Sequence, residues 1–149
     1  VNGFLYNHES PRRGANFVTQ KICHGAAAIA FGIEEELRLG DTSMERDWTD
    51  ARDVVRGMWL SLQANQPDDY IFASGQTHTV QEVVGIAFET VGLKWEDYVV
   101  RDDSFKRKKE PIDLIGDASK AKALLDWEPK NSFNELIIEM TRAAIQKMR

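Results

Sequence analysis

The chain has very little cysteine, and Cys23 is the single example among its 149 residues. One cysteine excludes an internal disulfide, and its apolar, helix-like surroundings predict a buried and unreactive thiol. The sequence also lacks an apolar run long enough to span a membrane and lacks a signal-peptide pattern at its start. We expect no membrane association, and a reducing, cytoplasmic setting fits these absences.

Positive charge is also scarce, because 19 Lys and Arg residues face 24 Asp and Glu residues, which gives a formal net charge of −5. A surface that coats nucleic acid needs a basic excess, so we expect no nucleic-acid partner. Any anionic ligand must therefore be held locally by Arg and Lys side chains. The remaining composition is that of an ordinary globular protein, one domain or part of a larger one.

Several catalytic motifs are missing from the sequence. It contains no G-x-G-x-x-G run, no P-loop and no Tyr followed four residues later by Lys. The histidines, His8, His24 and His78, show no spacing typical of metal ligands. Residues 1–149 are therefore expected to carry binding residues, with no catalytic residue and no metal site.

Strand and helix patterns alternate along the chain, which predicts the α/β class. Apolar runs predict strands over 1–6, 37–40, 70–74 and 95–100. Helical spacing and capping signals predict helices over about 18–30, 50–64, 80–91, 117–125 and from Phe133 onward. Thr79 with Glu82 and Ser132 with Glu135 form capping-box patterns, and Gly32 and Gly92 are predicted to end helices. The helix over 50–64 has a one-sided apolar stripe made of Val54, Val55, Met58, Trp59 and Leu62.

The start of the chain is unusual, because Val1 already lies in a strand-like run without a preceding Met or polar segment. We therefore expect a piece of a longer protein. The residues after this first strand, Asn7 to Gly14, predict a turn. Such a turn is either a solvated corner or a ligand site, since ligands bind beyond the carboxyl ends of strands in open α/β sheets.

Three polar clusters are predicted to lie in loops: Asn7 with Arg12 and Arg13, the run 46–48, and Arg107 with Glu110 in a Lys-rich segment. A nucleotide diphosphate needs two or three cations, with a carboxylate for the sugar hydroxyls. The alternatives are a solvated turn for the first cluster, a surface ion pair of Arg46 and Asp47 for the second, and a solvated loop for the third.

At these clusters the sequence resembles the carboxyl-terminal half of the GDP-mannose 4,6-dehydratase family of extended short-chain dehydrogenases/reductases. The resemblance rests on the run Leu5–Thr19 (LYNHESPRRGANFVT), followed by Lys21 and Ile22. It continues through Arg46-Asp47-Trp48, Gly57-Met58-Trp59, Ala73–Val80, Gly116-Asp117 and Trp127-Glu128-Pro129. The resemblance implies that the chain contains the last Rossmann strands and a small α/β subdomain, which together form a substrate-binding portion. It also implies that the amino-terminal NADP-binding portion is absent from this chain.

The resemblance implies roles for eight residues. Asn7 matches a contact to the pyrophosphate of the sugar nucleotide, and Arg46 matches a phosphate-binding residue. Val18 and Lys21 match residues that face the guanine. The remaining four are Arg107 and Glu110, matched to phosphate and ribose contacts, and His8 and Arg13, matched to positions near NADP.

The implied reaction converts GDP-mannose to GDP-4-keto-6-deoxymannose, and its catalytic residues belong to the missing half. The chain alone is therefore expected to be inactive, and the full-length protein to be a homo-oligomer, a dimer or tetramer. Two alternatives stay open. One is a GDP-sugar epimerase or 4-keto reductase of the same superfamily, and the other is a non-catalytic nucleotide-sugar-binding or oligomerisation module.

Overall fold

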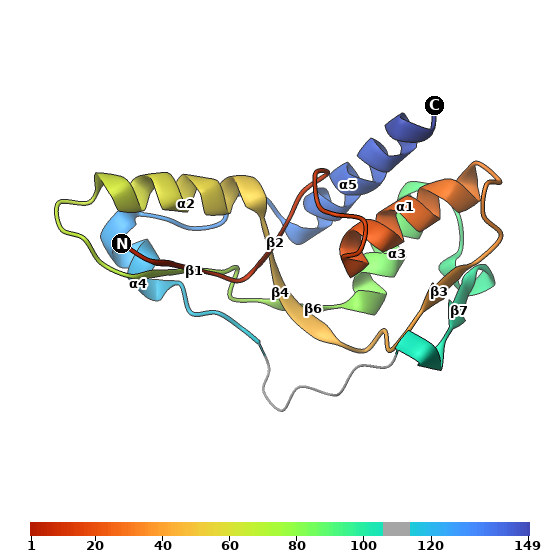
Figure 1. Cartoon of the computed structure of the whole chain (residues 1–149), viewed down its shortest axis with the longest axis horizontal. Coiled ribbons are helices and arrows are strands. Elements are labelled where there is room, and N and C mark those ends of the chain that lie inside the picture. The colour runs from red at the N-terminus through yellow and green to blue at the C-terminus, as the bar shows by residue number, and fades with distance from the viewer. Residues whose placement is uncertain (106–113) are drawn as a thin grey trace.

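A computed structural model describes residues 1–105 and 114–149 of the chain. The molecule is elongated, with the amino terminus at one end and the carboxyl terminus at the other (Figure 1). Two hydrophobic clusters lie at the two ends, and a small sheet between them connects the two. Within the described residues, no helix is both long and apolar enough to cross a bilayer.

The amino-terminal end of the molecule is built on two parallel strands, β1 (Gly3–Leu5) and β5 (Tyr70–Phe72). Helices α2 (Ala51–Gln63) and α4 (Ser119–Leu125) pack beside them. Trp127 is fully buried here, meets Phe72 edge-on at 5.0 Å and donates a hydrogen bond from Nε1 to the Asp53 carbonyl. This cluster joins segments that lie far apart in the sequence.

The second cluster holds three helices, α1 (Val18–Ala30), α3 (Val80–Thr90) and α5 (Phe133–Met148). Two parallel strands, β3 (Leu37–Leu39) and β7 (Val99–Arg101), flank them at the other end of the molecule (Figure 1). Ile22, Phe88 and Ile137 are fully buried at its centre, and Cys23 lies among them. The prediction of a buried thiol is therefore confirmed.

A three-stranded sheet with the order β2-β4-β6 lies in the middle. Strand β2 (Asn7–Glu9) runs parallel to β4 (Glu45–Asp50), and β6 (Thr77–Thr79) runs antiparallel to it. The predicted turn over Asn7–Gly14 is thus wrong for its first three residues. The predicted loop at 46–48 is wrong throughout. These polar strands have no apolar alternation, and the hydrogen bonds that form them come from distant segments.

Most helix signals hold in the structure. Thr79 and Ser132 form the predicted capping boxes, and Gly32 and Gly92 follow helices with positive φ angles of 69° and 75°. The predicted strand over 95–100 is shorter, because Trp95–Asp97 forms a 3₁₀ turn (η1) before β7. A second such turn, η2 (Asp103–Phe105), precedes residues 106–113.

Helix α2 departs from the usual arrangement of an apolar stripe against the core. Of the five stripe residues, only Val54 is buried. The helix instead packs through its small residues, since a Cβ on Gly57 would lie 2.4 Å from Phe72 and 2.8 Å from Trp127. The rest of the stripe therefore faces outward.

Candidate functional site

The register of the middle sheet brings two predicted phosphate-binding residues near each other. Asn7 at the start of β2 pairs with Trp48 of β4, and Arg46 lies two residues before Trp48 on the same strand. Two residues span about 7 Å along a strand, which is within reach of an Arg side chain. Asn7 and Arg46, 39 positions apart in the numbering, thus lie on adjacent strands.

A buried carboxylate connects this sheet to the first turn of α1. Glu9 is 2% exposed, and its Oε2 accepts a 2.6 Å hydrogen bond from the Thr19 hydroxyl. The same oxygen lies 3.2 Å from Nε of Arg13. Burial raises the pKa of Glu9, although the Thr19 hydrogen bond and the Arg13 charge both oppose this shift. Glu9 therefore holds the loop after β2 against the start of α1.

The two residues matched to guanine contacts lie on the exposed side of that first turn of α1. Val18 is 36% exposed, and Lys21 follows three positions later, which places both side chains on one face of the helix. Nζ of Lys21 donates a 2.7 Å hydrogen bond to the Arg38 carbonyl and lies 4.2 Å from the centre of the Phe105 ring. An ammonium has three donors, so this one remains able to bind a further acceptor.

The other predicted residues are held by local contacts. The Arg13 guanidinium lies 3.5 Å from the centre of the Phe17 ring, a cation–π arrangement. Nδ1 of His8 lies 2.9 Å from the Tyr6 carbonyl oxygen, and Nη1 of Arg46 donates to the Glu45 carbonyl at 2.7 Å. Both Arg107 and Glu110 lie outside the described residues.

Asp47, next to Arg46, has a structural role that the sequence did not reveal. Its fully buried carboxylate accepts hydrogen bonds from the backbone N–H groups of Ser74, Gly75 and Gly116 at 2.8, 3.0 and 3.1 Å. The Ser74 hydroxyl donates a fourth at 2.6 Å. Asp47 thereby fixes β4, and with it the backbone of Arg46, against two other segments.

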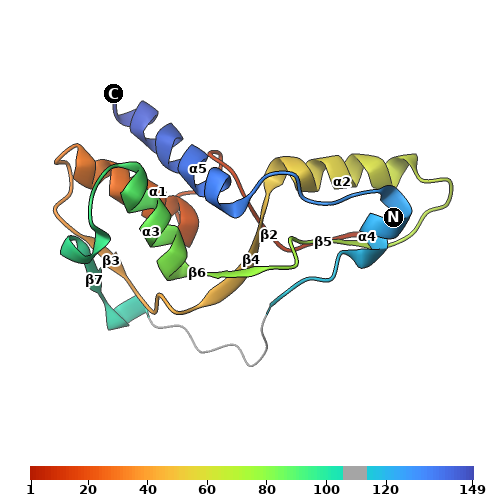
Figure 2. The same cartoon turned by 180° about the vertical axis from the view of Figure 1, so that it is seen from behind.

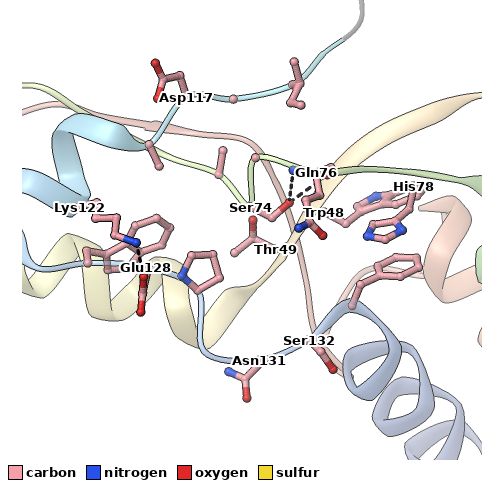
Figure 3. A pocket seen from close by; sticks show the side chains of 18 of the residues that line it. Trp48, Thr49, Ser74, Gln76, His78, Asp117, Lys122, Glu128, Asn131 and Ser132 are labelled. Atoms are coloured by element: carbon pink, nitrogen blue, oxygen red, sulfur yellow. Dashed lines mark hydrogen bonds and ion pairs between the residues drawn. The ribbon is translucent and has the colours of Figure 1, made fainter.

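A groove of about 860 Å³ lies beside this sheet, shown in close-up in Figure 3. His78 stacks on Phe133 with ring centres 3.8 Å apart, and Lys122 and Glu128 form an ion pair at 2.8 Å. None of the six described residues with predicted roles lines this groove. Half of its lining residues come from the resemblance motifs without an assigned role, Ala73–Val80, Gly116-Asp117 and Trp127-Glu128-Pro129.

No group of three or more His, Cys, Asp or Glu side chains in the described part of the chain could hold a metal ion. The chemistry of the sheet edge is instead that of hydrogen-bond donors. An amide, two guanidinium groups and an ammonium lie on β2, β4, the loop between β2 and α1, and the first turn of α1. Such a set suits an anionic ligand with several oxygen atoms.

Solved structures define the class of this fold. RMD from Pseudomonas aeruginosa, complexed with NADPH, superposes with a TM-score of 0.88 at 19% identity and covers 97% of this chain and 48% of its own. A dTDP-glucose 4,6-dehydratase from Bacillus anthracis, in complex with NAD, gives 0.78 at 22% identity, with 97% and 44% covered. The fold is that of the extended short-chain dehydrogenases/reductases.

Sequence comparison narrows the class to a family. The model of the family described as GDP-mannose 4,6 dehydratase matches residues 1–140, and the chain belongs to this family. It is 48% identical over 136 residues to GDP-mannose 4,6 dehydratase 1 of Arabidopsis thaliana, covering 91% of this chain and 38% of the relative. The human GDP-mannose 4,6 dehydratase is 42% identical over 166 residues, with 100% and 45% covered. The chain therefore spans less than half the length of these relatives.

Proposed function

We propose that this chain is the GDP-sugar-binding portion of a GDP-mannose 4,6-dehydratase, a hydro-lyase that converts GDP-mannose to GDP-4-keto-6-deoxymannose. The observation that carries the proposal is the β2–β4 register, which places Asn7 beside the strand of Arg46. The amide and the guanidinium supply neutral and charged donors to the pyrophosphate oxygens.

Recognition of the base is assigned to the first turn of α1. Guanine presents the acceptors O6 and N7, which suit the ammonium of Lys21, and the exposed Val18 supplies an apolar and backbone contact. We further propose that Arg107 and Glu110 contact the phosphate and the ribose. Phe105, the last described residue before them, lies against Lys21.

We assign His8 and Arg13 to the binding of the cofactor NADP. Most of the contacts to this cofactor are made by the rest of the full-length protein. A guanidinium stacked on Phe17 and paired with Glu9 through Nε keeps its terminal nitrogens as donors for a phosphate, so the residues present fit this group. The nicotinamide supplies hydride transfer when bound. We propose a homo-oligomer, a dimer or tetramer, for the full-length protein.

The test uses a chimera in which this chain replaces the matching region of the Arabidopsis enzyme. Arg46→Ala should weaken the binding of GDP-mannose by about 1.5–3 kcal/mol, the range for a hydrogen bond to a charged group. Isothermal titration calorimetry measures the change directly. The matched control is Arg101→Ala on β7, whose exposed side chain pairs with Asp103. Equal dissociation constants for the Arg46→Ala and Arg101→Ala proteins would contradict the assignment.

A further inference from the structure

His78 lies directly opposite Arg46 in the middle sheet, where β6 runs beside β4 and leads into α3 (Figures 1 and 2). The two residues are partners in the antiparallel register, so their side chains extend from the same face of the sheet. The Cβ atoms of such partners are about 4.5–5.5 Å apart. Trp48, two positions after Arg46, shares this face, and so does Asn7, its partner on β2. A histidine therefore lies beside the residues proposed to bind the pyrophosphate.

The imidazole ring of His78 is held in place from two helices. It stacks on Phe133, the first residue of α5, with ring centres 3.8 Å apart and planes within 4° of parallel. Trp48 stacks on the same Phe133 ring at 5.9 Å. In the first turn of α3, Oε1 of Glu82 lies 3.2 Å from Nδ1 of His78. These contacts fix both the plane of the imidazole and the direction of its nitrogen atoms.

The elements packed against His78 bring several charged side chains near it. The nearest along these elements are Arg46 and Glu45 on β4, Glu82 on α3 and Glu135 on α5. Burial opposes ionisation of Glu82, but hydrogen bonds from Thr79 and His78 lower its pKa. Hydrogen bonds from Ser132 lower the pKa of Glu135. Both carboxylates therefore keep their charge near neutral pH, whereas a histidine is the kind of side chain that changes its charge there.

The contact with Glu82 determines where the ring of His78 gains a proton. An ionised carboxylate only accepts hydrogen bonds, so the neutral ring carries its hydrogen on Nδ1. The proton that makes the ring cationic is therefore taken up at Nε2. No contact within residues 1–105 and 114–149 occupies Nε2, so this nitrogen is open to a ligand or to water.

We propose that His78 is an electrostatic partner of Arg46 in binding the pyrophosphate, and that binding of the nucleotide sugar takes up a proton at the His78 ring. This inference rests on the proposed function, because it needs the pyrophosphate at Arg46. The proton comes from the buffer and is bound at Nε2. A cationic ring attracts the anion, whereas a neutral ring presents at Nε2 a lone pair that a phosphate oxygen cannot bind. By linkage, an anion that favours the cationic ring binds more tightly as the pH falls.

The experiment is titration calorimetry of the chimera with GDP-mannose, in buffers of different ionisation enthalpy at a fixed ionic strength. The dependence of the heat on the buffer gives the number of protons taken up. GDP-mannose suits this measurement because its pyrophosphate is a diester and, unlike a phosphate monoester, has no group that titrates near pH 6. The wild-type chimera should bind GDP-mannose about threefold or more tightly at pH 6 than at pH 8, as expected for one added charge near the ligand.

Two variants remove the titrating ring in different ways. His78→Phe keeps an aromatic ring against Phe133, and His78→Gln keeps a donor toward Glu82. Both should take up less proton than the wild type and lose its pH dependence. At pH 8 the His78→Phe protein should match the wild-type affinity within about twofold, because histidine is mostly neutral there. The matched control is His24→Phe, at an exposed position on α1, which should take up as much proton as the wild type.

Proton uptake that both His78 variants retain would overturn the proposal. Weaker binding of His78→Phe by the same factor at both pH values would also overturn it, because the ring would then act through packing alone. Failure of the proposed function gives a different result, since the chimera would not bind GDP-mannose or would bind it equally well after Arg46→Ala. That result would remove both proposals. Tight binding that depends on Arg46 without uptake of a proton at His78 would remove this inference alone.

Discussion

The carboxylate of Asp47 accepts a 3.1 Å hydrogen bond from the backbone N–H of Gly116, 69 positions further along the chain. The same carboxylate binds Ser74 and Gly75, so one buried side chain joins β4, the residues after β5 and the residues after 106–113. Arg46 and Trp48 are its direct neighbours on β4. The geometry of the proposed phosphate site therefore depends on a residue that need not touch the ligand.

Replacing that carboxylate tests its structural role. Asp47→Ala should lower the free energy of unfolding by about 3 kcal/mol or more, because three backbone N–H groups and a hydroxyl lose an acceptor that is charged and fully buried. Urea denaturation measures the change. Asp97→Ala, on an exposed position of η1, serves as the control and should stay within about 0.5 kcal/mol of the wild type. A loss for Asp47→Ala no larger than that of the control would show that backbone pairing alone holds these segments.

Two helical glycines give opposite expectations for the same substitution. Gly57→Ala should destabilise the protein by about 1–3 kcal/mol, because the new methyl group overlaps the rings of Phe72 and Trp127. Gly85→Ala in α3 meets no atom within 4 Å and should stabilise the protein by about 0.5–1 kcal/mol through helix propensity. Thermal unfolding of the two variants measures both changes in stability. A stable Gly57→Ala protein would mean that α2 lies farther from the sheet than described.

The buried Glu9 predicts a specific pH dependence. Its pKa in the folded state is raised above the ordinary 4.5, chiefly by burial, so the folded state holds this proton more tightly than the unfolded state. The stabilisation that this tighter proton binding gives the folded state is complete below pH 4.5 and is lost as the pH rises through the folded-state pKa. Glu9→Gln removes this titration. The stability of the variant relative to wild type should therefore increase with pH above 4.5, as measured by denaturation between pH 4 and 7. A constant difference would contradict the raised pKa.

Cys23 should resist thiol reagents in the folded protein. Burial raises its pKa to about 11, so both thiolate formation and access are suppressed. Labelling with Ellman's reagent should proceed at the rate of unfolding and accelerate with urea. A Ser43→Cys variant places a thiol in an exposed loop and should react immediately under the same conditions. Fast native labelling of Cys23 would show that α1 opens away from α5.

The sequence predicted those elements whose signals are local. The capping boxes at Thr79 and Ser132 and the glycines at 32 and 92 mark helix ends correctly, because each acts within one helical turn. Strands β2, β4 and β6 escaped prediction because short polar strands form only through pairing between distant segments. The apolar stripe of α2 was correctly recognised as one face of a helix. Its exposure could not follow from periodicity, which does not tell a core from an unpartnered surface.

The residues of the candidate site likewise divide into those that the sequence could identify and those that only the fold reveals. Asn7, Lys21 and Arg46 could be selected from the sequence through a family resemblance, and the register of β2 and β4 gives two of them a common location. Glu9 and Asp47 could not be selected, since their roles depend on hydrogen bonds to Thr19 and Gly116 that only the fold brings into reach. Both are carboxylates, and the polar residues around them in the sequence give no sign that they are buried.

The central claim, that this chain recognises a guanine nucleotide sugar, is tested most directly by nucleotide preference. Titration calorimetry on the chimera should show tighter binding of GDP-mannose than of UDP-glucose. Lys21→Met should reduce that preference about tenfold, as expected for one lost donor to guanine, while Lys94→Met, at an exposed position on α3's distal loop, should not. Equal affinity for the two nucleotide sugars, or a preference that Lys21→Met leaves intact, would contradict the account.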